Sequence, residues 1–257
     1  MIDLHSHILP RVDDGAETLK ESIEMAKAAV NDGITEIVAT PHHKTTRFDN
    51  SKSEILPKVK KLNEALAERD IPLTVLPGQE TRVYGDFVDD LQNGEILTIN
   101  EHTNYVLVEF PHAQVPWFAK QLLYNLQVAG YRPIIVHPER NEQLIEEPDL
   151  LYEFVNNGAF TQLTAGSILG HFGKEYKKFS YELMNANLAH LISCDAHNTS
   201  HRGFCLTEAY TAVRAEYGLE RVFFFAENAE AVVKGNMVDT FEPEQVKRSK
   251  LLGLFSK

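Results

Sequence analysis

Short apolar stretches alternate along the chain with longer segments in which apolar residues recur every three or four positions. The first long segment follows Thr18-Leu19-Lys20-Glu21, whose capping-box spacing predicts the start of a helix. We predict strands at Ile2–His7, Ile34–Thr40, Leu73–Leu76, Tyr105–Val108, Pro133–Val136, Ala159–Thr164, Leu188–Ser193 and Val222–Phe225. Helices are predicted through Leu19–Val30, Ile55–Leu66, Asp86–Gln92, Phe118–Leu126, Leu151–Asn157, Tyr181–Asn187, Leu206–Tyr217 and Asn228–Lys234.

The regular alternation of predicted strands and helices indicates an α/β fold. No long low-complexity linker interrupts the 257 residues, so we expect one domain spanning residues 1–257. This pattern favours either a parallel α/β barrel or a doubly wound sheet. The stretch Gln245–Lys257 mixes basic and apolar residues. We expect it to form a last helix packed outside the barrel, with contact to a membrane or a partner as the alternative.

Histidine and carboxylate side chains gather where the predicted strands end. The candidates are His5, His7, Asp14, His42, Glu80, Glu109, His137, Asp195 and His197. Because the carboxyl ends of parallel barrel strands meet at one face, we expect these side chains to lie together. One His-x-His pair alone is weak evidence, since a strand places alternate residues on one face for many reasons. Several such clusters in one chain predict a metal centre.

The mixture of imidazoles and carboxylates indicates a centre with two or three ions. Imidazole suits zinc, iron and manganese, and carboxylates suit hard divalent ions. The four carboxylates would repel one another strongly without cations. A multinuclear centre lowers the pKa of bound water and stabilises in-line displacement at phosphorus, so no serine or cysteine nucleophile is required. Glu109 is the least secure candidate, because a single glutamate at a strand end often pairs with an arginine.

Two arginines close to the candidate ligands extend the prediction to a phosphorylated substrate. Arg140 lies three residues after His137, and Arg202 lies five residues after His197. Guanidinium groups match the oxygens of a phosphate, so both are candidate catalytic and substrate-binding residues. The alternative is that they pair with ligand carboxylates. His43 is a further candidate for substrate binding, with a role in shaping its loop as the alternative.

Composition narrows the class of protein. The two cysteines, Cys194 and Cys205, suggest no disulfide framework, and neither begins a Cys-x5-Arg phosphatase motif. The net charge of −12 argues against general nucleic-acid binding, but not against a phosphorylated substrate, because bound cations offset carboxylates. No apolar run is long enough for a membrane span and no signal-peptide pattern opens the chain, so we expect a cytoplasmic protein.

The order His-x-His, Asp, Thr-Pro-His-His, Glu, Glu, His-Pro-Glu-Arg, Asp-Ala-His resembles that of the PHP (polymerase and histidinol phosphatase) superfamily. More narrowly, the opening Met-Ile-Asp-Leu-His-Ser-His-Ile-Leu-Pro with Val-Asp-Asp-Gly is similar to the CpsB/CapC branch. That branch consists of bacterial metal-dependent protein tyrosine phosphatases linked to capsule and exopolysaccharide synthesis. The resemblance implies a distorted (β/α)7 TIM-like barrel, the PHP fold, with three divalent metal ions at its C-terminal face.

The resemblance also implies roles for the candidate residues. One ion would take His5, His7, Glu80 and Asp195, a second would take Glu80, Glu109 and His137, and the third would take Asp14, His42 and His197. Manganese is the usual ion in this branch, with iron, cobalt or zinc as alternatives. Arg140 and Arg202 would grip the phosphate of phosphotyrosine. The implied partners are tyrosine-phosphorylated proteins, among them the tail of a cognate bacterial tyrosine kinase.

Three other functions fit part of the sequence. Histidinol phosphatase shares the fold and the metal chemistry, but it requires a closed pocket for a small cationic amino alcohol. A nuclease or polymerase-associated module is disfavoured by the acidic balance and the lack of a basic stripe. A metal-stabilised binding protein without turnover is disfavoured by the two arginines beside the ligands, because structural metal sites seldom keep open coordination.

Overall fold

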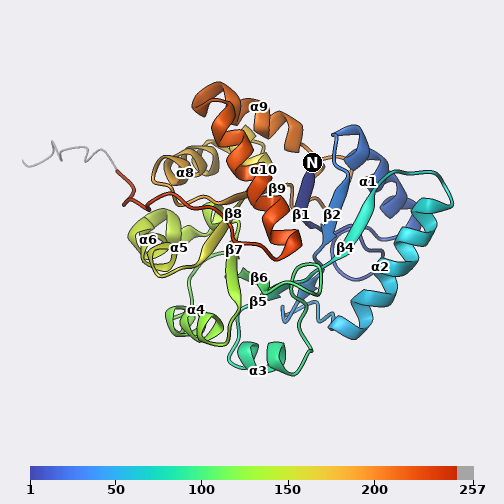
Figure 1. Ribbon diagram of the computed structural model, residues 1–257, viewed down its shortest axis with the longest axis horizontal. Helices are drawn as coiled ribbons and strands as arrows, with labels where there is room; N and C mark the ends of the chain where they lie inside the picture. Colours follow the sequence, from blue (N-terminus) through green and yellow to red (C-terminus); the bar gives the residue numbers. More distant parts are fainter. Residues whose placement is uncertain (248–257) are drawn as a thin grey trace, which may run out of the picture.

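The strands lie at the centre of the molecule, with the helices arranged around them (Figure 1). The computed structural model describes residues 1–247, and all strand pairs within them are parallel. One sheet has the order β1 (Ile2–Ser6), β2 (Glu36–Ala39), β4 (Thr74–Pro77). The second has the order β3 (His42–His43), β5 (Glu80–Arg82), β6 (Tyr105–Glu109), β7 (Arg132–Val136), β8 (Phe160–Thr164), β9 (Leu191–Ser193).

The two sheets together form a barrel-like arrangement. Only residues 40–41 separate β2 from β3, and only residues 78–79 separate β4 from β5, so each pair continues one path through the fold. Beyond β9, the N–H of Asp195 donates a hydrogen bond of 2.9 Å to the carbonyl of His5 on β1. The neighbour relations of the strands therefore return to β1. The predicted α/β fold with parallel strands is confirmed. The barrel is distorted at two breaks, between β2 and β3 and between β4 and β5.

Helices follow most of the strands and cover their outer faces. They are α1 (Leu19–Asn31), α2 (Lys52–Ala67), α3 (Phe87–Gln92), α4 (Ala119–Val128), α5 (Glu142–Glu146), α6 (Pro148–Asn156), α7 (Ala165–Leu169), α8 (Lys174–Asn185), α9 (Leu206–Tyr217) and α10 (Leu219–Lys234), with a short 3-10 helix at Pro138–Arg140. The predicted cap of α1 is confirmed, because the Thr18 side chain accepts a hydrogen bond of 3.2 Å from the N–H of Glu21. A large apolar cluster fills the space between the strands and these helices.

The predicted strand at Val222–Phe225 is wrong. These residues lie inside α10, which continues to Lys234. The run of valine and phenylalanine has strand propensity, but Phe225, Ala229 and Val232 are buried at intervals of four and three residues. The helical spacing over the longer segment therefore outweighs the local preference of four residues.

Two further expectations concern the surroundings of the barrel. The predicted helix in Gln245–Lys257 falls mostly on residues 248–257, which lie outside the described part of the chain. Within residues 1–247, no helix has both the length and the apolar composition required to cross a membrane.

A separate apolar cluster fills the inside of the barrel, and α10 closes one end of it. Its buried members are Leu4, Val38, Ile99, Tyr105, Leu107, Ile134, Val136, Phe160, Leu191, Ala229, Val232, Val233 and Val238. Tyr105 is the first residue of β6, and its hydroxyl donates a hydrogen bond of 2.7 Å to the carbonyl of Asn236, just after α10. The helix therefore lies across the amino ends of the strands, where Figure 1 shows it in front of them.

The opposite ends of the same strands become polar. On β6, Tyr105 and Leu107 belong to the inner cluster, and Glu109 is the next residue on that face. On β8, Phe160 belongs to the cluster and Gln162 follows it on the same face. The inward face thus changes from apolar to polar at the carboxyl ends of these strands.

Removing part of the α10 contact should destabilise the fold. We expect Val232→Ala to lower the free energy of unfolding by about 2 kcal/mol, because this fully buried side chain would leave a cavity inside the barrel. Urea denaturation followed by circular dichroism measures the effect. Glu227→Ala, at an exposed position of the same helix, is the control and should change stability by less than about 0.5 kcal/mol. Equal effects of the two variants would contradict the role given to α10.

Candidate metal centre

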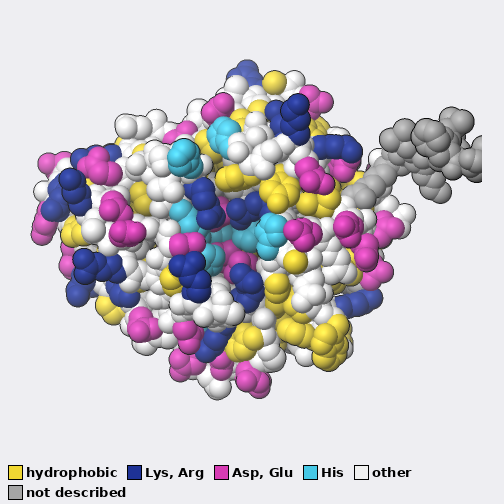
Figure 2. Space-filling view, turned by 180° about the vertical axis from the view of Figure 1, so that it is seen from behind, with side chains coloured by type: hydrophobic (Ala, Val, Ile, Leu, Met, Phe, Trp, Pro, Cys, Tyr) yellow, Lys and Arg dark blue, Asp and Glu magenta, His cyan; other side chains and the backbone are white. Residues whose placement is uncertain are grey.

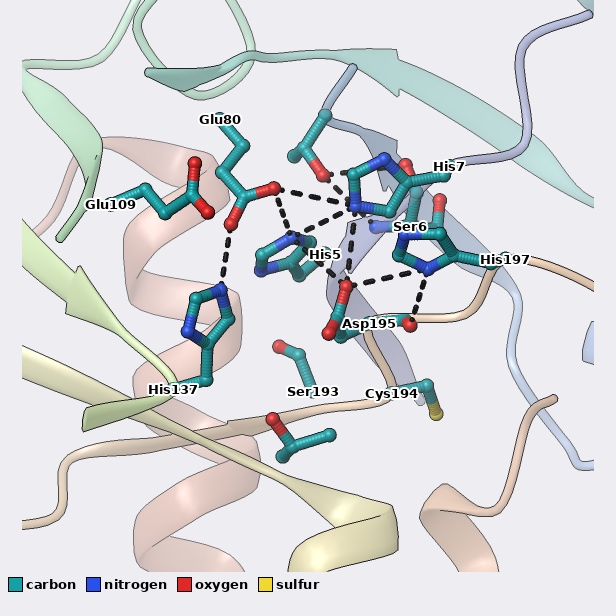
Figure 3. Close-up of polar contacts among 12 residues, drawn as sticks. His5, Ser6, His7, Glu80, Glu109, His137, Ser193, Cys194, Asp195 and His197 are labelled. Atoms are coloured by element: carbon teal, nitrogen blue, oxygen red, sulfur yellow. Dashed lines mark hydrogen bonds and ion pairs between the residues drawn. The ribbon is translucent and has the colours of Figure 1, made fainter. Parts of the chain in front are cut away.

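His5 on β1 and His7 just after this strand form the innermost part of the site (Figure 3). The pairing of β1 with β2 shifts register between Asp3 and Ser6, and His5 and His7, two residues apart, both face the open end of the barrel. Their Nε2 atoms are 3.3 Å apart. Both Nε2 atoms lie 3.2–3.4 Å from carboxylate oxygens of Glu80 and Asp195.

Two neighbouring side chains hold these imidazoles in orientation. The Nδ1 atom of His7 lies 2.7 Å from Oδ2 of Asp13, and Nδ1 of His5 lies 2.8 Å from Oε1 of Gln162. When Nδ1–H donates to these oxygens, the lone pair of Nε2 is directed into the site, as metal-binding histidines require. Sequence reasoning missed both partners. The inward position of Gln162 on β8 is the signal that would have indicated this residue.

Glu80 connects the first group to a second one. Its fully buried carboxylate lies 2.8 Å from Nδ1 of His42 and 2.7 Å from Nε2 of His137. Glu109 is further away, with Oε2 3.7 Å from Nδ1 of His42. One carboxylate therefore lies within reach of imidazoles from three strands or strand ends, those of β1, β3 and β7, since His5 approaches it as well.

Asp14 completes a third group at the mouth of the site. Its Oδ1 atom lies 3.4 Å from Nε2 of both His42 and His197. The loop that carries Asp14 is packed tightly, because a Cβ added to Gly15 would come within 2.0 Å of the carbonyl oxygen of His7. Any larger residue at position 15 would move the loop away from the histidines.

The residues present fit divalent metal ions. Three groups bring one ligand atom per residue to within 4.8 Å of one another: His7, Asp14, His42 and His197; His5, His7 and Glu80; His42, Glu80 and Glu109. Oε2 of Glu80 and Nε2 of His197 are buried and make no hydrogen bond in the described part of the chain. Buried polar atoms that lack a well-aligned hydrogen bond are costly, and a cation bound beside each of them would satisfy it. His137 and Asp195 border the same groups through Glu80, His5 and His7.

The electrostatics of the cluster call for positive charge. Burial and the charge of Glu80 together raise the pKa of Glu109 to about 7. Burial is the largest influence on the pKa of His42 and lowers it, but the charge of Glu80 and the hydrogen bonds with Asp14 and Glu80 together raise this pKa to about 10. Burial likewise raises the pKa of Asp195, but Arg140 and the neighbouring histidines together hold this pKa well below its usual range. Without metal, His5, His7 and His42 therefore keep protons that balance the carboxylates, because their pKa values are raised. Burial lowers the pKa of His137 and of His197 to about 4, so these two imidazoles are neutral.

A cavity of about 360 Å3 lies above the cluster, and three arginines line it. Nη2 of Arg140 and Nη2 of Arg202 lie 2.5 and 2.9 Å from Oδ2 of Asp195. Arg82 holds Glu109 through two hydrogen bonds of 2.9 and 2.7 Å. Arg140 and Arg202 thus pair with a carboxylate of the cluster and also line the cavity. Sequence reasoning missed Arg82, two residues after Glu80 on the same strand face.

Figure 2 shows histidine and acidic side chains in a hollow, with Lys and Arg side chains around it. The structure does not bring His43 into this hollow. Its imidazole is buried, with Nδ1 2.9 Å from Oδ1 of Asp49, and it is not among the residues that line the cavity. His43 and His42 are consecutive on β3, so their side chains point to opposite faces.

The backbone is strained where two candidate ligands lie. His137 has a φ of 36° and Asp195 a φ of 51°, both in the left-handed region that residues with a Cβ rarely adopt. Each follows the end of a strand, so the strain turns the side chain across the barrel mouth rather than along the strand. Strain of this kind is typical of functional sites, where the surrounding structure holds it.

Comparisons with known proteins agree with this geometry. Tyrosine-protein phosphatase YwqE of Bacillus subtilis (strain 168) is 47% identical over 255 residues, which cover 99% of this chain and 100% of that protein. Putative tyrosine-protein phosphatase CapC of Staphylococcus aureus is 38% identical with the same coverage. A crystal structure of YwqE, described together with CpsB of Streptococcus pneumoniae as unique metal-dependent tyrosine phosphatases, matches with a TM-score of 0.94 and 46% identity, covering 96% of this chain and 100% of that chain.

More distant structures share the fold alone. Organophosphorus hydrolase from Deinococcus radiodurans matches with a TM-score of 0.57 and 13% identity, covering 90% of this chain and 91% of that chain.

The family described as capsular polysaccharide synthesis, CpsB/CapC, matches residues 1–234, which include every candidate ligand. The resemblance seen in the sequence is thereby confirmed, and the chain belongs to the CpsB/CapC family.

Proposed function

We propose that this protein is a metal-dependent protein tyrosine phosphatase linked to capsule or exopolysaccharide synthesis. The observation that carries the proposal is one cavity in which three arginines face a cluster of imidazoles and carboxylates. Phosphate esters are bound by guanidinium groups and divalent ions together. The names of the similar proteins from Bacillus and Staphylococcus support phosphotyrosine as the substrate.

The proposed cofactors are three divalent ions, most suitably manganese, with iron, cobalt or zinc as alternatives. We assign His5, His7, Glu80 and Asp195 to one ion, Glu80, Glu109 and His137 to another, and Asp14, His42 and His197 to the third. The convergence of these side chains supports the assignment. Four carboxylates in the set favour a hard ion such as manganese. When bound, such ions supply Lewis acidity that lowers the pKa of water and offsets negative charge on a phosphoryl group.

The protein's own residues orient the substrate. Arg140 and Arg202 approach Asp195 from the cavity side, so their remaining N–H groups are available to phosphoryl oxygens. Arg82 fixes both carboxylate oxygens of Glu109 and so restricts its orientation. Tyrosinate leaves readily, because its conjugate acid has a pKa of about 10, and the reaction therefore makes a modest demand on a general acid.

The proposed mechanism requires no cysteine nucleophile. Cys194 is buried, and burial raises the pKa of its thiol well above the usual value. Its side chain points away from the metal-site residues in Figure 3. Neither Cys194 nor Cys205 is among the residues that line the cavity. A thiol that is both protonated and remote is unsuited to nucleophilic attack.

The proposed substrates are tyrosine-phosphorylated proteins in the cytoplasm, including the tail of a bacterial tyrosine kinase. Histidinol phosphate fits the cavity less well, because its ammonium group would need a carboxylate. The carboxylates that line the cavity are Glu80, Glu109 and Asp195, and each is already paired with imidazoles or arginines. A phenolic substrate has no such requirement.

Phosphate release with manganese should be fast from a phosphotyrosine peptide and slow from histidinol phosphate. A chelator should abolish the release, and added manganese should restore it, because the ions supply the Lewis acidity that the reaction requires. A malachite-green phosphate assay compares both substrates in parallel. Faster release from histidinol phosphate would indicate a histidinol phosphatase instead. No phosphate release from either substrate with metal bound would favour a binding protein without turnover.

Arg140→Lys should lower kcat by about 100- to 1,000-fold while leaving manganese content unchanged. Lysine keeps a positive charge beside Asp195 but loses the planar fork that matches phosphate. Arg214→Lys, at an exposed position of α9, is the control and should behave as the unsubstituted protein. If Arg140→Lys loses metal in proportion to activity, the arginine acts only by holding Asp195.

Manganese binding should release protons, and its affinity should rise with pH. His42 has its pKa raised to about 10 and is protonated at lower pH, and the pKa of His7 is also raised. A metal binds neutral imidazole, so these protons must leave as the ion enters. Calorimetric titrations in buffers of different ionisation enthalpy measure the number released. Identical enthalpies in all buffers would show that the histidines are already neutral.

A further inference from the structure

One wall of the cavity is aromatic and has no part in the metal centre. Phe172 and Tyr176 line it from the turn after α7 and the first part of α8, and Phe110 lines it from the residue after β6. The floor, in contrast, consists of candidate metal ligands and arginines. A molecule that fills this cavity therefore meets charge at one end and aromatic carbon at the other.

The ring of Phe172 has a defined position. It lies in a short turn between Gly170 and Gly173, whose φ values of 90° and 115° a residue with a Cβ rarely adopts. The ring also packs on the backbone of α7, because a Cβ added to Gly166 would come within 2.8 Å of Cε2 of Phe172. The glycines on either side and beneath thus place this ring over the cavity.

The same ring borders the group proposed to hold the phosphate. Cζ of Arg140 lies 5.7 Å from the centroid of Phe172, within the range of a cation–π contact. In an aryl phosphate the ring begins one oxygen atom away from phosphorus. A phosphoryl group held by Arg140 therefore places an attached aryl ring against this aromatic wall.

We propose that Phe172 is a specificity-determining residue that binds the phenyl ring of the substrate and makes the site prefer aryl to alkyl phosphates. The inference rests on the proposed phosphatase function and names the feature of the substrate that the cavity recognises. Aromatic rings gain from stacked or edge-to-face contact beyond the area they bury. Alkyl phosphates of serine or of a small amino alcohol cannot make that contact.

Calorimetric binding of phenylphosphonate and methylphosphonate to the manganese-loaded protein tests the proposal without turnover. Phe172→Ala should weaken phenylphosphonate by about 3- to 10-fold and change methylphosphonate by less than about 2-fold. Phe172→Tyr should keep the phenyl preference. Gly166→Ala, which displaces the ring without removing it, should reduce the preference in the same direction. Trp117→Ala is the control, because Trp117 is 94% exposed and does not line the cavity.

Equal weakening of both phosphonates in Phe172→Ala would overturn the proposal, as would a loss of preference in Phe172→Tyr. Manganese content and the thermal midpoint of each variant show whether the site and the fold are intact. The two levels of inference fail separately. Normal phenyl preference without hydrolysis of phosphotyrosine peptides would contradict the function alone. Hydrolysis of those peptides with unchanged phenylphosphonate binding in Phe172→Ala would contradict the role of Phe172 alone.

Discussion

The burial of several carboxylates at one end of the barrel is the constraint on which the rest of the site depends. Glu80 is fully buried and Asp195 nearly so, and neither could remain ionised there without positive charge nearby. The structure supplies that charge from two sides, with imidazoles in the barrel mouth and with arginines on the cavity side. Metal ions would replace the imidazole protons, while the arginines remain for a substrate that itself brings negative charge.

The sequence predicted the positions of the candidate ligands well because they depend on one simple rule. A parallel barrel brings the ends of its strands together, so residues distant in the chain converge once each is placed at a strand end. Glu109 and His137, for example, required only the correct ends of β6 and β7. The fold class followed from the alternation of predicted strands and helices. The incorrect strand at Val222–Phe225 affected no strand that contributes to the site.

The contacts between side chains were much harder to predict. Gln162 and Arg82 carry no motif, and their roles depend on which face of a strand each occupies and on the neighbour it meets across the barrel. The position of His43 away from the cavity was hard to predict for the same reason, because adjacent residues on a strand face opposite ways. Phe172 depends on a turn between two helices, whose course is set by glycine conformations that a single sequence does not reveal.

The barrel separates stability from chemistry along the length of its strands. At the amino ends, α10 and the inner cluster pack together as a buried apolar core, with Val232 fully buried. At the carboxyl ends, buried charges and the left-handed backbone of His137 and Asp195 both cost stability. Because the two regions share the same strands, the apolar end holds the backbone rigid where the charged end requires fixed positions. The site can therefore keep an arrangement that its own residues, without bound cations, would not favour.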